Sequence, residues 1–241
     1  MRHRLVALAV LMSAPSLLQA QNYRLELPWP SPHANVSQVV GLTTLSVDYH
    51  RPGVNKRVVW GGLVPWDSVW RAGANENTVL ASTSAFTVGG TTLPAGRYGV
   101  FMIPGRDRWT VILSRQANAW GAFSYDATED AVRFSVTPAP AEFTERLQYN
   151  FDDPTNEIVT LTMRWEKLAV SFPVSINSDR VVLDSLAAQL RNLPRFWGTA
   201  WEQAGAWALN NTTDLAQAEI WADTAVALAP TFASYNLKAA I

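Results

Sequence analysis

The sequence predicts a mainly β protein, an antiparallel β-sandwich with a barrel as the alternative, followed by a small α-helical tail. Short β-prone runs separated by Gly- and Pro-containing turns fill residues 37–176, a pattern typical of all-β sandwiches and barrels. After Asn177 the apolar residues recur at helical spacing instead. Of the 241 residues, 48% are hydrophobic and 16% are charged, so the chain can bury a sizeable core and does not belong to the disordered class.

Residues 1–20 have the features of a secretory signal peptide. Arg2 and Arg4 precede an apolar run that is too short to span a bilayer, and the small residue Ala20 follows. We expect cleavage after Ala20, with an uncleaved membrane anchor as the alternative. The expected product is an exported chain, periplasmic or extracellular, without a membrane span. Residues 21–36 are predicted to form an extended N-terminal segment.

The β domain, residues 37–176, is expected to consist of short antiparallel strands. Leu45, Val47 and Tyr49 alternate with polar residues, as in a half-buried strand. Gly89-Gly90 predicts a two-residue hairpin, because tight primed turns require positive φ. The remaining strands are expected at Val79–Ser82, Ala85–Val88, Thr91–Leu93, Arg97–Ile103, Arg108–Ser114, Ala131–Thr137, Glu142–Phe151, Glu157–Trp165 and Lys167–Ile176. Among the Trp residues, Trp109 is expected in the core and Trp120 at the surface.

Residues 177–241 are expected to form the helical tail. Asn177 or Ser178 can cap its first helix, and Pro194 ends that helix. Further helices are expected at Phe196–Asn210, Asp214–Ala229 and Thr231–Ile241. The small residues Ala206, Ala218, Ala222 and Ala225 make this region similar to one tetratricopeptide unit. Because one such unit cannot bury its own face, the tail is expected to dock on the β domain or on a protein partner.

The charge balance and the lack of Cys exclude several classes of function. Residues 1–20 contain two Arg and no acid, so their removal leaves 17 Lys and Arg against 20 Asp and Glu, a net charge of about −3. A mildly acidic chain has no electrostatic reason to bind nucleic acid. The absence of Cys excludes disulfides, thiol nucleophiles and thiolate metal sites. We expect neither a metal nor a cofactor.

The β region also resembles a known family. The matching stretches are Ser31–Gln38, Val47–Pro52, Gly61–Pro65, Trp70–Glu76, Leu93–Tyr98, Trp120–Asp126 and Trp165–Lys167. On these stretches the chain resembles the secreted bacterial family called domain of unknown function 2911. The resemblance implies export and a stand-alone β domain, and it implies no activity.

The stretch VWRAGANENT, residues 69–78, is the strongest candidate for a site. Arg71 offers five donors in a fixed fork, Glu76 is a natural acceptor and Gly73 permits a tight bend between them. They form either a closed structural ion pair or, with the basic residues Arg51, Lys56 and Arg57, a binding site for a small polar or anionic ligand. The candidate ligand-binding residues are Arg51, Arg57, Arg71, Asn75, Glu76, Tyr98 and Trp120.

Two other functions remain open. His50 with Asp48 or Glu76 could serve a hydrolase-type enzyme as an acid–base pair, and His33 could add a ligand for a metal. Exposed Trp side chains could instead stack on carbohydrate. We favour the non-catalytic binding module, because no hydrolase elbow, phosphate-binding loop or dinucleotide fingerprint occurs in the sequence.

Overall fold

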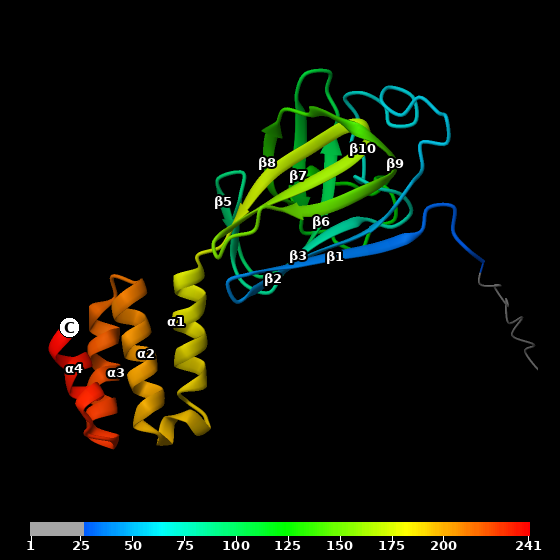
Figure 1. Ribbon diagram of the computed structural model, residues 1–241. Coiled ribbons are helices and arrows are strands. Elements are labelled where there is room, and N and C mark those ends of the chain that lie inside the picture. The colour runs from blue at the N-terminus through cyan, green and yellow to red at the C-terminus, as the bar shows by residue number, and fades with distance from the viewer. Residues whose placement is uncertain (1–26) are drawn as a thin grey trace, which may run out of the picture.

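A computed structural model describes residues 27–241 and shows a mainly β protein, with 40% strand and 26% helix (Figure 1). The expected signal peptide, residues 1–20, lies outside the described residues. Within the described part of the chain, two antiparallel sheets face each other without closing into a barrel, and four helices follow. The predicted fold class is therefore confirmed in its sandwich form.

The larger sheet has six strands in the order β1-β2-β3-β6-β7-β8. Their bounds are β1 His33–Val40, β2 Thr43–His50, β3 Thr78–Ser82, β6 Gly96–Ile103, β7 Trp109–Ser114 and β8 Asp130–Val136. In β2 the side chains alternate between buried and less buried, as the period of two in the sequence predicts. β1 begins at His33, inside the segment expected to precede the β domain.

The smaller sheet has four strands in the order β5-β4-β10-β9. Their bounds are β4 Phe86–Val88, β5 Thr91–Leu93, β9 Ala139–Asp152 and β10 Ile158–Ser175. The predicted hairpin joins β4 to β5, with φ of 57° at Gly89 and 77° at Gly90. The sequence predicted two strands where β10 runs continuously, and this prediction was wrong. Glu166 has φ of 56° within a register irregularity, so it forms a bulge instead of a turn.

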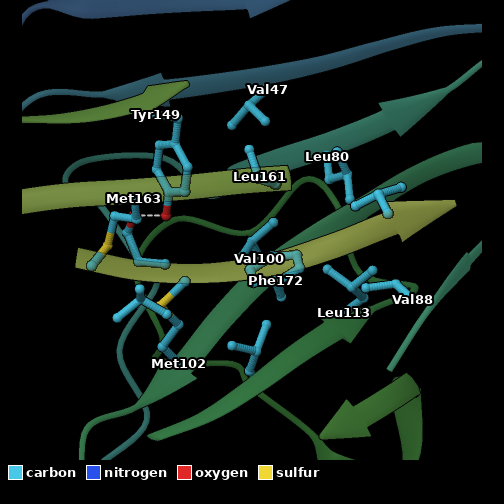
Figure 2. Packing of buried hydrophobic residues seen from close by; sticks show 14 of the residues in the cluster. Val47, Leu80, Val88, Val100, Met102, Leu113, Tyr149, Leu161, Met163 and Phe172 are labelled. Atoms are coloured by element: carbon cyan, nitrogen blue, oxygen red, sulfur yellow. Dashed lines mark hydrogen bonds between the residues drawn. The ribbon is translucent and has the colours of Figure 1, made fainter. Parts of the chain in front are cut away.

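The core lies between the two sheets (Figure 2). Val47, Leu80 and Val100 of the larger sheet meet Leu161 and Phe172 of the smaller one. Trp109 is 1% exposed, as predicted. Four Trp side chains, at positions 60, 70, 109 and 165, pack together in this core with ring centroids of contacting pairs 4.7 to 5.9 Å apart.

The helical tail has its own small core beside the β body (Figure 1). Its helices are α1 Ser178–Gln189, α2 Gly198–Asn211, α3 Leu215–Leu228 and α4 Phe232–Ala240. Asn177 caps α1 by accepting from the Arg180 amide, as the sequence predicted. The Ser178 hydroxyl donates to the Asn156 carbonyl, which ties the start of α1 to the loop before β10. No helix within residues 27–241 has the length and hydrophobicity needed to cross a bilayer.

Candidate functional site

The loop Trp70–Glu76 is held to the core by hydrogen bonds. The backbone of Trp70 exchanges two hydrogen bonds of 2.8 Å with Met102 in β6. The Trp70 indole donates to the Gly73 carbonyl at 3.1 Å. The Ala72 carbonyl accepts from the hydroxyls of Thr78 at 3.0 Å and Tyr149 at 2.8 Å. Ala72 has φ of 53°, a left-handed conformation that costs a non-Gly residue roughly 1–2 kcal/mol and must be held by such contacts.

Asn75 connects two further segments, the N-terminal segment and the loop that carries Trp120, to this loop by hydrogen bonds. Its side-chain amide donates to the Ser31 carbonyl at 3.3 Å, and its own carbonyl accepts from the Gly121 amide at 3.1 Å. Asn75 also has positive φ, 56°, which Asn tolerates better than most residues. The N-terminal segment and the loop that carries Trp120 therefore meet at Asn75.

Arg71 lies in this loop with its guanidinium partly buried and, among the described residues, without a carboxylate partner. The ion-pair partner of Glu76 within residues 27–241 is His50, and not Arg71. Arg71 Nε is buried and lacks a hydrogen-bond partner in the same residues. Burial lowers the pKa of Arg71 from its ordinary value, and the nearby charge of Glu76 acts in the opposite direction. The closed Arg71–Glu76 ion pair, one of the two alternatives that the sequence left open, is not what the structure contains.

Beside Arg71 is a pocket of about 260 Å³. Its polar lining residues are Ser31, Arg57, Arg71 and Asn75. Its remaining lining residues are Pro52, Leu63, Val64, Trp70, Gly73, Ala74 and Trp165. None of these residues of the described chain is acidic, so two guanidinium groups set the charge of the pocket. Two guanidinium groups within the lining favour an anionic guest, although the charge of Glu76, which does not line the pocket, acts on Arg71 in the opposite sense.

Arg51 and Arg57, two of the other basic candidates, donate to backbone carbonyls of the protein. Arg51 donates to the Leu147 carbonyl at 2.9 Å, which ties the end of β2 to β9. Arg57 donates to the carbonyls of Gly53 at 2.6 Å and Val54 at 3.1 Å while it lines the pocket. Lys56 is exposed and has φ of 59°. Of the basic cluster, the structure therefore brings Arg57 and Arg71 to the pocket.

Tyr98 is not brought to this pocket. It lies in the core, 6% exposed, with its hydroxyl donating to the Pro94 carbonyl at 2.9 Å. Burial raises the pKa of this phenol. Its ring packs against Phe86, which is a structural contact.

A cluster of two His and two acidic residues lies at the ends of β1 and β2. His33 and His50 are cross-strand partners with ring centroids 5.3 Å apart. His33 Nε2 lies 2.9 Å from Asp48 Oδ1, and His50 Nδ1 lies 3.5 Å from Glu76 Oε2. Burial lowers the pKa of His50, partly opposed by the charge of Glu76. His50 is therefore beside Glu76, whereas Asp48 pairs with His33.

No group of three or more His, Cys, Asp or Glu within residues 27–241 has the spacing of a metal site. The distance of 3.5 Å from His50 to Glu76 is at the outer limit of a hydrogen bond. The arrangement can relay a proton only after this gap shortens. The hydrolase hypothesis thus stays a prediction.

Trp120 lies at the surface, 57% exposed, beside Phe123, which is 86% exposed. The two rings are nearly parallel, 12° apart, with centroids separated by 6.0 Å. The guanidinium of Arg71 lies 5.8 Å from the Trp120 ring centroid, within the range of a cation–π contact. The predicted exposure of Trp120 is confirmed.

The candidate residues chosen from the sequence omitted eight residues that line the pocket: Ser31, Pro52, Leu63, Val64, Trp70, Gly73, Ala74 and Trp165. Trp165 lies in β10, far along the chain from Arg71, so no local pattern could place them together. Its membership of a stretch shared with the resembled family, Trp165–Lys167, is the one signal that pointed to it.

Comparison with known proteins gives one result. A family model described as "Protein of unknown function (DUF2911)" matches residues 31–174. No curated protein and no solved structure gives a significant match. The matched residues include the whole pocket beside Arg71 and the His50 cluster.

Proposed function

Given that the chain belongs to the DUF2911 family of proteins of unknown function, we propose that it is a non-catalytic binding module that holds a small polar or anionic ligand at Arg71. The observation that carries the proposal is the half-buried guanidinium of Arg71, whose Nε has no partner among residues 27–241. A buried donor without an acceptor costs about 1–3 kcal/mol. Nε itself is sealed from solvent, but the terminal N–H groups of the same guanidinium make no hydrogen bond or ion pair within residues 27–241, and Arg71 lines the pocket, so a ligand oxygen can accept from them.

The surroundings of Arg71 support an anion in particular. Arg57 lines the same pocket, and Asn75 adds an amide at its edge. Loops at the end of a rigid β scaffold are a common place for binding residues. The hydrogen bonds from Thr78 and Tyr149 to Ala72 hold the residue next to Arg71 in position before any ligand arrives.

The test is a thermal-shift and calorimetric titration of the full mature chain with acetate, inorganic phosphate and sulfate. Binding to the folded state alone raises the melting temperature by mass action. We expect Arg71→Gln to abolish this rise in melting temperature, because the substitution removes the positive charge and the paired N–H donors of the guanidinium. The control is Arg97→Gln, which removes an exposed Arg of β6 that does not line the pocket and should bind normally. The proposal is overturned if none of these anions binds, or if Arg71→Gln binds them unchanged.

A second candidate, carbohydrate binding, is favoured by the exposed, nearly parallel rings of Trp120 and Phe123. Sugar rings stack on such surfaces through their apolar faces. Soluble glycans should then quench Trp emission in the wild type and not in Trp120→Ala. Equal quenching in both proteins excludes this site.

Export and a tetratricopeptide-like tail complete the proposal. Export is supported by the basic start and apolar run of residues 1–20. The tail is supported by small buried residues where α2 and α3 pack, Ala204, Ala208, Ala218 and Ala222. Mass spectrometry of the protein recovered outside the cytoplasm should find Gln21 as the first residue. A protein partner for the tail remains a prediction.

A further inference from the structure

The carboxylate of Glu76 acts on both His50 and Arg71. Its Oε2 lies 3.5 Å from His50 Nδ1, and its charge also reaches the guanidinium of Arg71. From this arrangement we propose that anion binding at Arg71 is coupled to protonation of His50 through Glu76, so that the protein holds its ligand more tightly as pH falls. This inference names a regulation of the same site and rests on the proposed function.

His50 lies close to the pocket, at the end of β2. Its backbone carbonyl packs against Gly73, which lines the pocket, since a Cβ at Gly73 would lie 3.3 Å from that oxygen. The Trp29 ring lies beside the imidazole, with centroids 5.8 Å apart, and 13% of the His50 side chain is exposed. A charge on this largely covered imidazole is screened by solvent less than a charge on the surface.

Protonation changes the contact between His50 and Glu76. His50 Nδ1 is buried and has no hydrogen-bond partner among residues 27–241. A neutral imidazole carries one N–H, whereas an imidazolium donates from both nitrogens. Protonated His50 can therefore donate a charge-assisted hydrogen bond to Glu76, and its positive charge offsets that of the carboxylate. Glu76 then opposes the charge of Arg71 less, which favours an anion on the guanidinium.

The sign of the coupling follows from the groups around His50. Among the described residues, the titratable and charged groups that act on it are His33 of β1, Asp48 of β2, and Arg71 and Glu76 of the loop. Asp48 is engaged by His33 at 2.9 Å, so Glu76 is the ion-pair partner of His50. Burial lowers the pKa of His50 most, and the charge of Arg71 lowers it further. An anion that neutralises Arg71 removes this last effect, so affinity rises as pH falls through the pKa of His50 in the bound protein and levels off below its pKa in the free protein.

The test is calorimetric titration of the full mature chain with sulfate, which stays a dianion, at about pH 7.5 and about pH 5, on either side of the ordinary titration range of His. At constant ionic strength, we expect the wild type to bind sulfate roughly threefold or more tightly at the lower pH. His50→Gln cannot take up the proton and should lose most of this increase. The matched control is His33→Gln, whose imidazole is 54% exposed, and it should keep the increase. Glu76→Gln removes the opposing charge, so it should bind more tightly than the wild type at about pH 7.5 and gain less on acidification.

A second measurement does not depend on the folding of His50→Gln. Residues 21–241 contain two His, so NMR can follow the pKa of His50 in the wild type, with its signal identified by comparison with His33→Gln. We expect saturating sulfate to raise this pKa.

The outcomes separate the inference from the proposed function. If sulfate binds in an Arg71-dependent manner with the same affinity at both pH values, or leaves the pKa of His50 unchanged, the inference is wrong and the proposed function stands. If His50→Gln shows the full increase, another group is responsible for the pH dependence and the inference is also wrong. If no anion binds at either pH, the proposed function itself fails and the inference fails with it.

Discussion

The hydroxyl of Tyr149 donates a hydrogen bond of 2.8 Å to the carbonyl oxygen of Ala72, which joins the centre of the sandwich core to the residue next to Arg71. Tyr149 is buried between the sheets (Figure 2), and burial raises the pKa of its phenol well above the ordinary value. It is therefore a permanent donor at neutral pH. The position of Arg71 depends on packing deep in the core as well as on its own loop.

Tyr149→Phe is expected to lower the free energy of unfolding by about 1–2 kcal/mol, the usual cost of leaving a buried acceptor with one donor fewer. It should also weaken ligand binding, because Thr78 alone then holds the Ala72 carbonyl. Urea denaturation and the anion titration measure the two effects. Tyr98→Phe is the matched control, since its hydroxyl also donates to a carbonyl but lies away from the pocket. Equal binding by both variants would show that Tyr149 does not position Arg71.

Asn75 combines a left-handed backbone, with φ of 56°, and a side-chain hydrogen bond to Ser31. Asn75→Gly loses the hydrogen bond and keeps the backbone conformation at little cost. Asn75→Ala loses the hydrogen bond and adds strain, so it should be less stable than Asn75→Gly by about 1 kcal/mol. Paired urea denaturation curves measure this difference. If the two variants are equally stable, the left-handed conformation does not control the stability of this loop.

His50 should make stability depend on pH. Burial lowers its folded-state pKa below the ordinary value of 6.5, so the unfolded chain binds the proton more readily than the folded chain between these two pKa values. The stability contributed by neutral His50 is complete above about pH 6.5 and is lost as pH falls through the folded-state pKa. The melting temperature of the wild type should fall over this window more steeply than that of His50→Gln. Parallel curves for the two proteins contradict the prediction.

Trp109 and Trp120 should respond in opposite ways to truncation. Trp109 is 1% exposed and lies in the Trp cluster, so Trp109→Ala should cost about 3–5 kcal/mol or prevent folding. Trp120 is 57% exposed and contacts Arg71 at the surface, so Trp120→Ala should cost at most about 1 kcal/mol. Chemical denaturation of both variants measures the difference. A large loss in Trp120→Ala would mean that its loop is needed for the fold.

Most of the secondary structure could be predicted because its signals are local. Gly89-Gly90 predicts its hairpin from the need for positive φ, and Asn177 predicts the start of α1 from its capping side chain. The same local reasoning was wrong at Glu166. Positive φ occurs there inside a continuous strand, and only pairing with β9 distinguishes a bulge from a turn.

By itself the sequence determined the fold class, a mainly β domain followed by helices, because the spacing of apolar residues changes from the strand period to the helix period. It also showed a basic cluster in an acidic chain. The tertiary structure decided the state of Arg71. In sequence Arg71 and Glu76 are five residues apart and oppositely charged, which suggests a pair. In space Glu76 lies beside His50, whereas Arg71 lies over the Trp120 ring and lines a pocket together with Trp165, a residue from a distant segment. The reason is geometric, because the path of the folded backbone decides which groups each side chain can reach. Between Arg71 and Glu76 that path contains two residues in the left-handed conformation, Ala72 and Asn75.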